Sequence, residues 1–373
     1  MLFNDKSLIG IDIGAGGIKL VELHQRKKRP VLFTYGFINE KHNVHSLLKQ
    51  NLNPTGSAER LPVDPVDESN VAGYADKIKK LCLACRVKTK KVAVSLPVSS
   101  VFHAIVTLPV VKKEEETRSM IRSEVKKFIP WSLEEMALDY QFLEKPTKEA
   151  TTQKILVNAV PNKMISFYTK VFLRTGLKLE ALEPESSALA RSLIGRDQSV
   201  NMIVDIGAER TNFFIIENSV PIIHQSIDYG GHKIDSILKN NFGVQEDELV
   251  EQFKKDLFYN LNRQGQTLPE SLESQANMFK PVIEPILKEI EVNLEIYLRQ
   301  AGNAQKKPQK VILTGGTGFL PFLKEAIADK FKVKCYVGDP WARIIFQQSL
   351  KPVLHEIGPQ MSVAIGLALR NMV

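Results

Sequence analysis

The sequence predicts an α/β fold made of two duplicated domains, with a smaller α+β subdomain inserted into the first. Two observations predict the duplication. The segments IGIDIGAGGIK (9–19) and MIVDIGAERT (202–211) share a strand ending in Asp-Ile-Gly-Ala, and about half the chain separates them. Each is followed by a second apolar strand, so each is expected to be a β-hairpin with small residues at its turn. The third observation is that strands and amphipathic helices between residues 91 and 175 interrupt the first copy.

The composition is that of an ordinary globular protein. The chain has 373 residues, of which 43% are hydrophobic and 25% charged, enough for two or three domains with real cores. A net charge of +8 suits phosphate ligands or an anionic membrane surface but is too diffuse to predict nucleic-acid binding. Three cysteines argue against a disulfide framework, and the Cys82–Cys85 pair has no second pair to complete a zinc site. Without a signal peptide or a long apolar run, we expect a soluble cytoplasmic protein.

The first hairpin carries a carboxylate on a buried strand. Burying Asp12 without a partner would be costly, so the aspartate is expected to face a ligand or metal. After it, small residues would let backbone N–H groups approach a phosphate closely, and Lys19 would add a positive charge. These small residues are Gly14, Ala15, Gly16 and Gly17. The basic run Lys27–Arg29 lies between two apolar stretches and is expected to be a solvated hairpin tip.

The second hairpin repeats this pattern. Asp205 ends its first strand, and Gly207, Ala208 and Thr211 follow in the turn. Taken alone, either turn is equally well explained as an ordinary tight hairpin. As a facing pair, Asp12 and Asp205 would hold a hydrated Mg²⁺ between them, because that ion keeps several of its waters.

Two more segments are candidates for the same cleft. The strand at 310–314 ends in Gly315, Gly316, Thr317 and Gly318, followed by a helix over 321–330; this is a nucleotide-binding pattern, although a simple tight turn would look the same. In LEPESSALA (182–190), Glu183 opens a helix, where either a catalytic role or an ordinary helix start explains it. Gly230 and Gly231 precede a helix near His232, and a long helix is predicted from Pro281 to Gln300.

The inserted region predicts a small α+β module. Strands are expected at 92–95, 101–108, 136–143 and 155–160, and helices at 112–128 and 164–175. The first of these helices places Ile121, Val125, Phe128 and Ile129 on one apolar stripe. A module of this kind, with one helical face and one free sheet or groove, suits docking of a partner. The polar, proline-containing stretch at 51–70 is expected to be a surface loop.

The set of motifs and its order resemble the actin-like ATPase superfamily, whose fold is two ribonuclease-H-like domains. The two Asp-Ile-Gly-Ala turns look like its two phosphate motifs, and VILTGGTGFL (311–320) is similar to its adenosine motif. EPESSALA and QMSVAIGLAL resemble its two connecting helices, and Gly230–Gly231 the start of the helix that covers the second phosphate turn. The resemblance implies ATP and Mg²⁺ as ligands, and Glu183 as the residue that positions the attacking water.

Within that superfamily the chain resembles the PilM family of type IV pilus assembly. The resemblance rests on SLIGIDIGAGGIKLVEL, KVAVSLPVSSVFHAIVTLP, GLKLEALEPESSALARSL and, most specifically, FIPWSLEEMALDYQFL. It implies a first actin-like domain at 1–90 continued at 176–199, a partner-binding insert at 91–175, a second domain at 200–356 and a returning helix at 357–373.

The same resemblance implies partners and location. The expected partner is the N-terminal cytoplasmic peptide of the membrane protein PilN. PilO would be reached indirectly, an assembly ATPase is a further candidate, and self-association is left open. The protein would lie in the cytoplasm at the inner membrane, held there only through partners, and would serve twitching motility.

Departures from the superfamily pattern favour ATP binding over efficient turnover. The first turn offers only backbone where hydrolytic relatives place a hydroxyl, and Ala208 stands where actin has another acid. Two alternatives remain open. An FtsA-like filament would need tethering through a partner, because no amphipathic helix follows the last connecting helix. A sugar or acid kinase would need a catalytic base and an acceptor pocket, for which no convincing residues are found.

Overall fold

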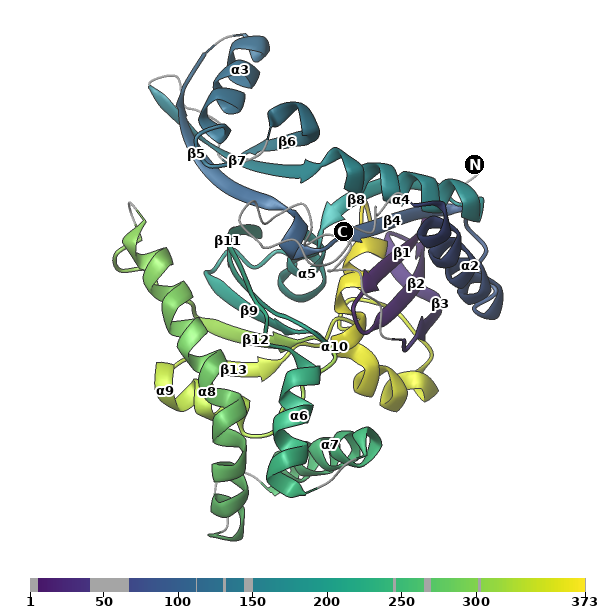
Figure 1. Cartoon of the computed structure of the whole chain (residues 1–373), viewed down its shortest axis with the longest axis vertical. Coiled ribbons are helices and arrows are strands. Elements are labelled where there is room, and N and C mark those ends of the chain that lie inside the picture. The colour runs from purple at the N-terminus through teal and green to yellow at the C-terminus, as the bar shows by residue number, and fades with distance from the viewer. Residues whose placement is uncertain are drawn as a thin grey trace.

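Three β-sheets organise the part of the chain that this computed structural model describes (Figure 1). The structure describes residues 6–40, 67–111, 113–129, 132–143, 150–243, 246–264, 270–300 and 303–372. In that part of the chain no helix is long and apolar enough to cross a membrane.

The two large sheets have the same strand order. In space the first runs β3 (Arg29–Ile38), β2 (Gly17–Arg26), β1 (Ser7–Gly14), β4 (Lys91–Leu96) and β8 (Lys178–Pro184). The second runs β11 (Val220–Ile227), β10 (Thr211–Glu217), β9 (Asn201–Ile206), β12 (Lys310–Thr314) and β13 (Lys334–Val337). In each, three antiparallel strands are followed by two parallel ones, so the predicted duplication is visible in the topology.

Two helices fill the space between the large sheets. They are α5 (Glu185–Leu189), which continues into the π-helical turn η3 (Ala190–Ile194), and α10 (Lys351–Ala368). Their apolar side chains form one core with residues from the facing sides of both sheets. A Cβ at Gly366 would lie 1.9 Å from the carbonyl oxygen of Ala188, so only glycine lets α10 approach α5 this closely. Because β1 and β9 are covered on both faces, they read as nearly continuous apolar runs.

Other helices cover the outer faces. The first sheet is covered by α2 (Glu68–Ala84) and α4 (Asn162–Thr175), and the second by α6 (Gly231–Phe242), α8 (Glu270–Arg299) and α9 (Leu323–Phe331), with α7 (Asp247–Gln264) packed beside α6. The prediction that a helix starts at Pro281 was wrong, because α8 begins at Glu270 and contains that proline. Phe279 and Val282, on either side of this proline, are both buried, so the apolar face of α8 continues past Pro281. Packing there outweighs the roughly 3 kcal/mol cost of an interior proline.

The inserted module is smaller than the sequence suggested. Its sheet has the order β5 (Phe102–Pro109), β7 (Thr152–Pro161) and β6 (Met136–Phe142), covered by α3 (Glu114–Val125). The predicted strand at 92–95 pairs instead with β1 and β8, and α4 packs on α2. Phe128 was wrongly placed on the buried stripe and is 59% exposed, because the helix ends at Val125 and its periodicity stops there.

Three smaller predictions have mixed outcomes. The basic run does form a hairpin tip, where Lys27 and Lys28 take φ angles of 46° and 64° between β2 and β3. Cys82 and Cys85 are free thiols packed against the core of the first sheet. Most of the predicted loop at 51–70 lies outside the described residues, and its end at Glu68 already belongs to α2.

Candidate functional site

A cleft of about 260 Å³ opens between the two Asp-Ile-Gly-Ala turns. Asp12 and Asp205 lie on equivalent central strands, one from each large sheet. The turns approach so closely that a Cβ at Gly16 would lie 3.1 Å from the Cβ of Ala208. Twelve of the residues predicted for the nucleotide site line this cleft: Asp12, Gly14, Ala15, Gly16, Lys19, Asp205, Gly207, Ala208, Gly231, Gly315, Gly316 and Thr317.

Asp12 has a cation and a hydroxyl as its partners. It lies directly opposite Lys19 in the pairing of β1 with β2, and the Lys19 Nζ is 3.5 Å from Asp12 Oδ2. On the other side, the Ser95 hydroxyl at the end of β4 donates a 2.8 Å hydrogen bond to Asp12 Oδ1. These two contacts explain how a carboxylate that is only 6% exposed is tolerated on this strand.

Asp205 has weaker support. Asn212, opposite it on β10, donates a 3.3 Å hydrogen bond from Nδ2 to Asp205 Oδ2. Asn212 is itself held by Ser226, whose hydroxyl donates to Asn212 Oδ1 at 2.7 Å. Burial and, to a lesser extent, the nearby Asp12 charge raise the pKa of Asp205 to about 6, against the lowering effect of the Asn212 hydrogen bond and the Lys19 charge. This carboxylate therefore favours a proton or a bound cation.

Glu185 is a third carboxylate in the cleft, which the sequence reasoning missed. It is the first residue of α5, and the backbone N–H of Val98 donates to its Oε2 at 3.3 Å. Burial raises the pKa of Glu185 well above its ordinary value, and the charges of Asp12 and Asp205 add to that effect. The sequence EPE contains two glutamates, Glu183 and Glu185, and the helix begins at the second of them.

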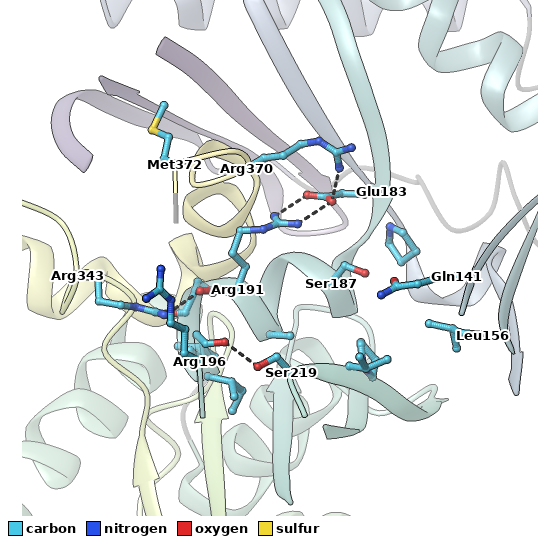
Figure 2. Close-up of a pocket in the computed structure, with 18 of the residues that line it drawn as sticks. Gln141, Leu156, Glu183, Ser187, Arg191, Arg196, Ser219, Arg343, Arg370 and Met372 are labelled. Carbon is cyan, nitrogen blue, oxygen red and sulfur yellow. Dashed lines mark hydrogen bonds and ion pairs between the residues drawn. The ribbon is translucent and has the colours of Figure 1, made fainter. Parts of the chain in front are cut away.

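Glu183 lies elsewhere, which corrects its predicted catalytic position. It belongs to β8 rather than to a helix, and its carboxylate faces a different cavity. Its two oxygens accept hydrogen bonds from Arg191 at 2.8 and 2.9 Å and from Arg370 at 2.7 Å (Figure 2). With both oxygens bound to arginines outside the phosphate cleft, Glu183 is placed to join β8 to η3 and to the residues that follow α10, not to orient water in that cleft.

Four other predicted site residues support the cleft without lining it. The Thr211 hydroxyl, expected at the phosphate, is fully buried and donates to the carbonyl of Tyr229. Gly17 has a φ of 133°, and a Cβ there would meet the Ile38 carbonyl oxygen at 1.9 Å, so it shapes the turn. Gly230 and Gly318 pack against neighbouring backbone.

A second cavity, of about 320 Å³, continues from the cleft. The two share Gly315, Gly316, Thr317 and Gln360. The walls of the second cavity are largely apolar, with Phe37, Phe319, Leu320 and Ile357. The lysines that line it are paired with acids: Lys254 Nζ lies 2.6 Å from both Asp235 and Glu251, and Lys255 Nζ lies 3.0 Å from Glu356. A charged cleft that leads into an apolar chamber has the two parts that phosphates and a base require.

The carboxylates fit Mg²⁺ better than a fully protein-bound metal. Among the described residues, no group of three or more His, Cys, Asp or Glu side chains could hold a metal by itself. Mg²⁺ is ordinarily bound by one or two carboxylates and completes its shell with waters and phosphate oxygens. Asp12 and Asp205 therefore fit the role predicted for them only if a phosphate ligand shares the ion.

Comparison with known proteins identifies the family. The family model described as "Type IV pilus assembly protein PilM" matches residues 10–372. The chain belongs to the PilM family. Among solved structures, one titled "PilM-PilN type IV pilus biogenesis complex" matches with a TM-score of 0.75 and 22% identity, over 98% of each chain. The ethanolamine utilization protein EutJ from Carboxydothermus hydrogenoformans matches with a TM-score of 0.53 and 16% identity, over 98% of this chain and 89% of that one. The fold is the predicted actin-like one.

This PilM-family chain has a further, larger cavity of about 1140 Å³, the groove (Figure 2). The module contributes β6 and β7 to one wall, including Gln141 and Leu156. The opposite walls come from β8, α5, η3, the start of β11 and the end of the chain. In Figure 2 the pair of arginines around Glu183 faces the module across this space.

Arg343 fixes one end of the groove. Its Nη2 donates to the backbone carbonyls of Arg191 and Ser192, both at 2.6 Å, and burial lowers the pKa of its guanidinium. These bonds hold η3, whose π-helical geometry leaves carbonyls available to a side-chain donor. The sequence predicted an insert with a free sheet or groove, but it could not identify these walls, because they come from seven separate segments of the chain.

Proposed function

We propose that this PilM-family chain is an ATP-binding scaffold of the inner-membrane platform for type IV pilus assembly, and that its groove binds the N-terminal cytoplasmic peptide of PilN. The observation that carries the proposal is the groove between the inserted module and the actin-like core. The related structure titled as a PilM–PilN complex supports PilN as the partner. A peptide held in this groove would keep the protein at the inner-membrane face.

The shape of the module suggests how a peptide binds. In the described part of its sheet, β6 is an end strand, paired only with β7, and three of its residues line the groove: Asp139, Tyr140 and Gln141. An extended peptide beside an edge strand satisfies its backbone polar groups there, while alternate side chains fill pockets. Leu156 offers an apolar contact, and Gln141 and Asn158 offer polar ones.

ATP is proposed for the two connected cavities. The small residues of the two turns would hold the phosphates through backbone N–H groups, and Lys19 would add its charge. Asp12 and Asp205 would share Mg²⁺ with those phosphates, and the apolar chamber near Phe37 and Phe319 would take the base. Bound Mg²⁺ supplies charge neutralisation for the phosphates.

Turnover, if it occurs, is expected to be slow and to depend on Glu185. Glu185 lines the cleft beside both aspartates, whereas Glu183 is held by two arginines elsewhere. Glu185→Gln should therefore lower phosphate release without lowering ATP affinity, because a residue that orients water acts after binding. Glu183→Gln is the matched variant two positions away. A release rate that fell only in Glu183→Gln would restore the original prediction.

The cleft and the groove share one helix. Glu185 begins α5 in the cleft, while Ser187, Ala190 and Arg191 line the groove farther along the same segment. Arg191 Nη1 also donates to the Gly366 carbonyl of α10 at 2.6 Å. Because a shift of this segment would alter both sites, we expect ATP and peptide to change each other's affinity by about 1–3 kcal/mol.

The test is calorimetric titration of the full chain with Mg–ATP and with a synthetic PilN N-terminal peptide, each with and without the other. Leu156→Arg places a charged side chain in the groove and should abolish peptide binding. Phe128→Arg, on an exposed position of the same module, is the control and should bind normally. Peptide binding that survives Leu156→Arg would place the partner elsewhere.

A further inference from the structure

The β2–β3 hairpin ends in four consecutive basic residues, the basic tip: Arg26, Lys27, Lys28 and Arg29. All four are exposed, and none makes an ion pair with an acidic side chain of the described chain. Arg26 and Arg29 lie directly opposite each other in the strand pairing. Like charges in that arrangement repel, so this sequence lowers the stability of its own hairpin. An external anion would remove that repulsion.

The basic tip is held rigidly at the edge of the groove. Lys28 lines the groove directly, as do Arg196, Arg343 and Arg370. Two contacts fix the hairpin. Gln25 Nε2 donates to the Met372 carbonyl at 3.3 Å, and the Ile345 N–H donates to the Pro30 carbonyl at 2.9 Å. The charges are therefore presented in a fixed place beside the proposed peptide site.

The surface beside the tip also carries apolar side chains. Phe33 and Ile345 are 41% and 46% exposed. Both flank Val31, since Ile345 forms an isolated bridge with Val31 and Phe33 lies two residues along the same strand. Basic residues beside an exposed aromatic and an aliphatic side chain suit the interface of an anionic bilayer, where charge meets headgroups and apolar groups enter the acyl boundary.

We propose that the basic tip binds the anionic lipid surface of the membrane while the groove holds the membrane-anchored peptide. This inference rests on the proposed function, because the peptide brings the groove edge to the bilayer. Attraction to anionic headgroups acts within a Debye length, about 8 Å at physiological salt, so a charged edge must lie at the membrane to benefit. The peptide and the tip then act as two linked contacts, and each raises the effective concentration of the other.

The expected size of the effect follows from the number of charges. A basic residue near an anionic surface contributes about a fivefold gain in binding, so neutralising three should cost about 100-fold. The test variant is Arg26→Gln/Lys27→Asn/Arg29→Gln, in which asparagine suits the positive φ of residue 27 and Lys28 is kept because it lines the groove. The matched control is Lys307→Gln/Lys332→Asn/Lys334→Gln, which removes three exposed charges from the second domain, one of them also at a positive φ of 51°.

The experiment measures co-sedimentation of the full chain with phosphatidylglycerol or phosphatidylcholine vesicles that carry the anchored PilN peptide. We expect the parent and the control to bind phosphatidylglycerol vesicles tightly, the tip variant to bind about 100-fold more weakly, and the difference to vanish on phosphatidylcholine. Equal binding of parent and tip variant to phosphatidylglycerol would overturn the proposal. The proposal would also be overturned if added single- or double-stranded DNA displaced the parent from the vesicles but did not affect the tip variant, because the basic tip would then prefer nucleic acid to lipid.

Titration with soluble peptide separates the two proposals. Suppose that the parent and the tip variant bind soluble peptide equally well. Equal binding of the two to phosphatidylglycerol vesicles then counts against the lipid contact alone and leaves the peptide site standing. If the parent does not bind soluble peptide, the proposed function fails, and binding of peptide-free phosphatidylglycerol vesicles then decides whether the tip contacts lipid at all.

Discussion

The two halves of the molecule share a strand order and a turn sequence but treat their aspartates differently. Asp12 in the first half pairs with Lys19 and accepts a hydrogen bond from Ser95. Asp205 in the second half has one amide donor, Asn212, and its pKa is raised to about 6. Duplication has therefore preserved the position of the carboxylate while its electrostatic support has diverged.

The difference separates a self-sufficient carboxylate from one that needs a ligand. The first half neutralises Asp12 within its own hairpin, so that strand is stable whether or not the cleft is filled. The second half buries Asp205 at a cost that a proton or a cation would offset. Strain of this kind at a cleft is typical of binding sites, where a stable empty state and a tight ligand site compete.

The largest expected effect is on stability. Asp205→Asn removes a buried charge and should raise the free energy of unfolding at pH 7 by up to about 3 kcal/mol, since each pKa unit between 3.8 and about 6 corresponds to about 1.4 kcal/mol. Asp12→Asn leaves Lys19 without its carboxylate partner and should lower that free energy. Urea denaturation of the ligand-free variants measures both. Equal effects in the two variants would mean that the halves do not differ as described.

The same Asp205 substitution that stabilises the ligand-free protein should weaken ligand binding. Both aspartates are proposed to hold Mg²⁺, so Asp205→Asn should weaken Mg–ATP binding by about 10- to 100-fold, given about 1.5–3 kcal/mol for a contact to a charged group. Asp205→Ala should do the same with the fold intact. The control is titration with ATP in the presence of a chelator, where parent and variants should agree. Unchanged Mg–ATP affinity in either Asp205 variant would remove it from the metal site.

The pH dependence follows from the raised pKa. Folded Asp205 binds its proton more tightly than the unfolded chain does, so its contribution to stability falls as the pH rises from about 4 to about 6, and is constant above. Mg²⁺ requires the ionised form, so Mg–ATP affinity should fall about tenfold for each pH unit below 6. Calorimetry at pH 5, 6 and 7 tests this, with ATP in chelator as the control. A flat profile would contradict the raised pKa.

Much of the fold could be predicted because local sequence patterns determine its strands and turns. The buried strands β1 and β9 are apolar runs, and the hairpin turns carry their small residues in sequence order. The errors arose where tertiary packing decides. The helix α8 continues through Pro281 because Phe279 and Val282 are buried. The strand β4 and the helix α4, which were predicted for the module, belong to the first large sheet and its covering helices. Their partners, such as β8, lie far away along the chain, so a local sequence pattern does not reveal them.

The site was predicted less completely, for a related reason. Residues in the turns, such as Gly16 and Ala208, could be found because a phosphate cradle needs small residues at fixed spacing. Glu183 and Glu185 could not be told apart, since the strand ends between them and only the position of that boundary decides which one enters the cleft. The hydroxyl of Thr211 was expected at the phosphate, but it donates to the Tyr229 carbonyl, which lies on a segment that the local sequence does not indicate.

The smallest expected effect concerns the hydrogen bonds that support each carboxylate. Asn212 donates to Asp205 and favours its ionised form, so Asn212→Ala should raise the pKa of Asp205 further and lower stability at pH 7 by about 1 kcal/mol. Ser95→Ala removes the donor to Asp12 and should lower stability by a similar amount without moving the pKa of Asp205. Carboxyl NMR of aspartate-labelled protein, with Asp205→Asn to assign the signal, follows that pKa directly. If Ser95→Ala shifted the Asp205 titration as much as Asn212→Ala did, the two halves would act as one coupled network, because a hydrogen bond that supports only its own strand cannot reach the other carboxylate.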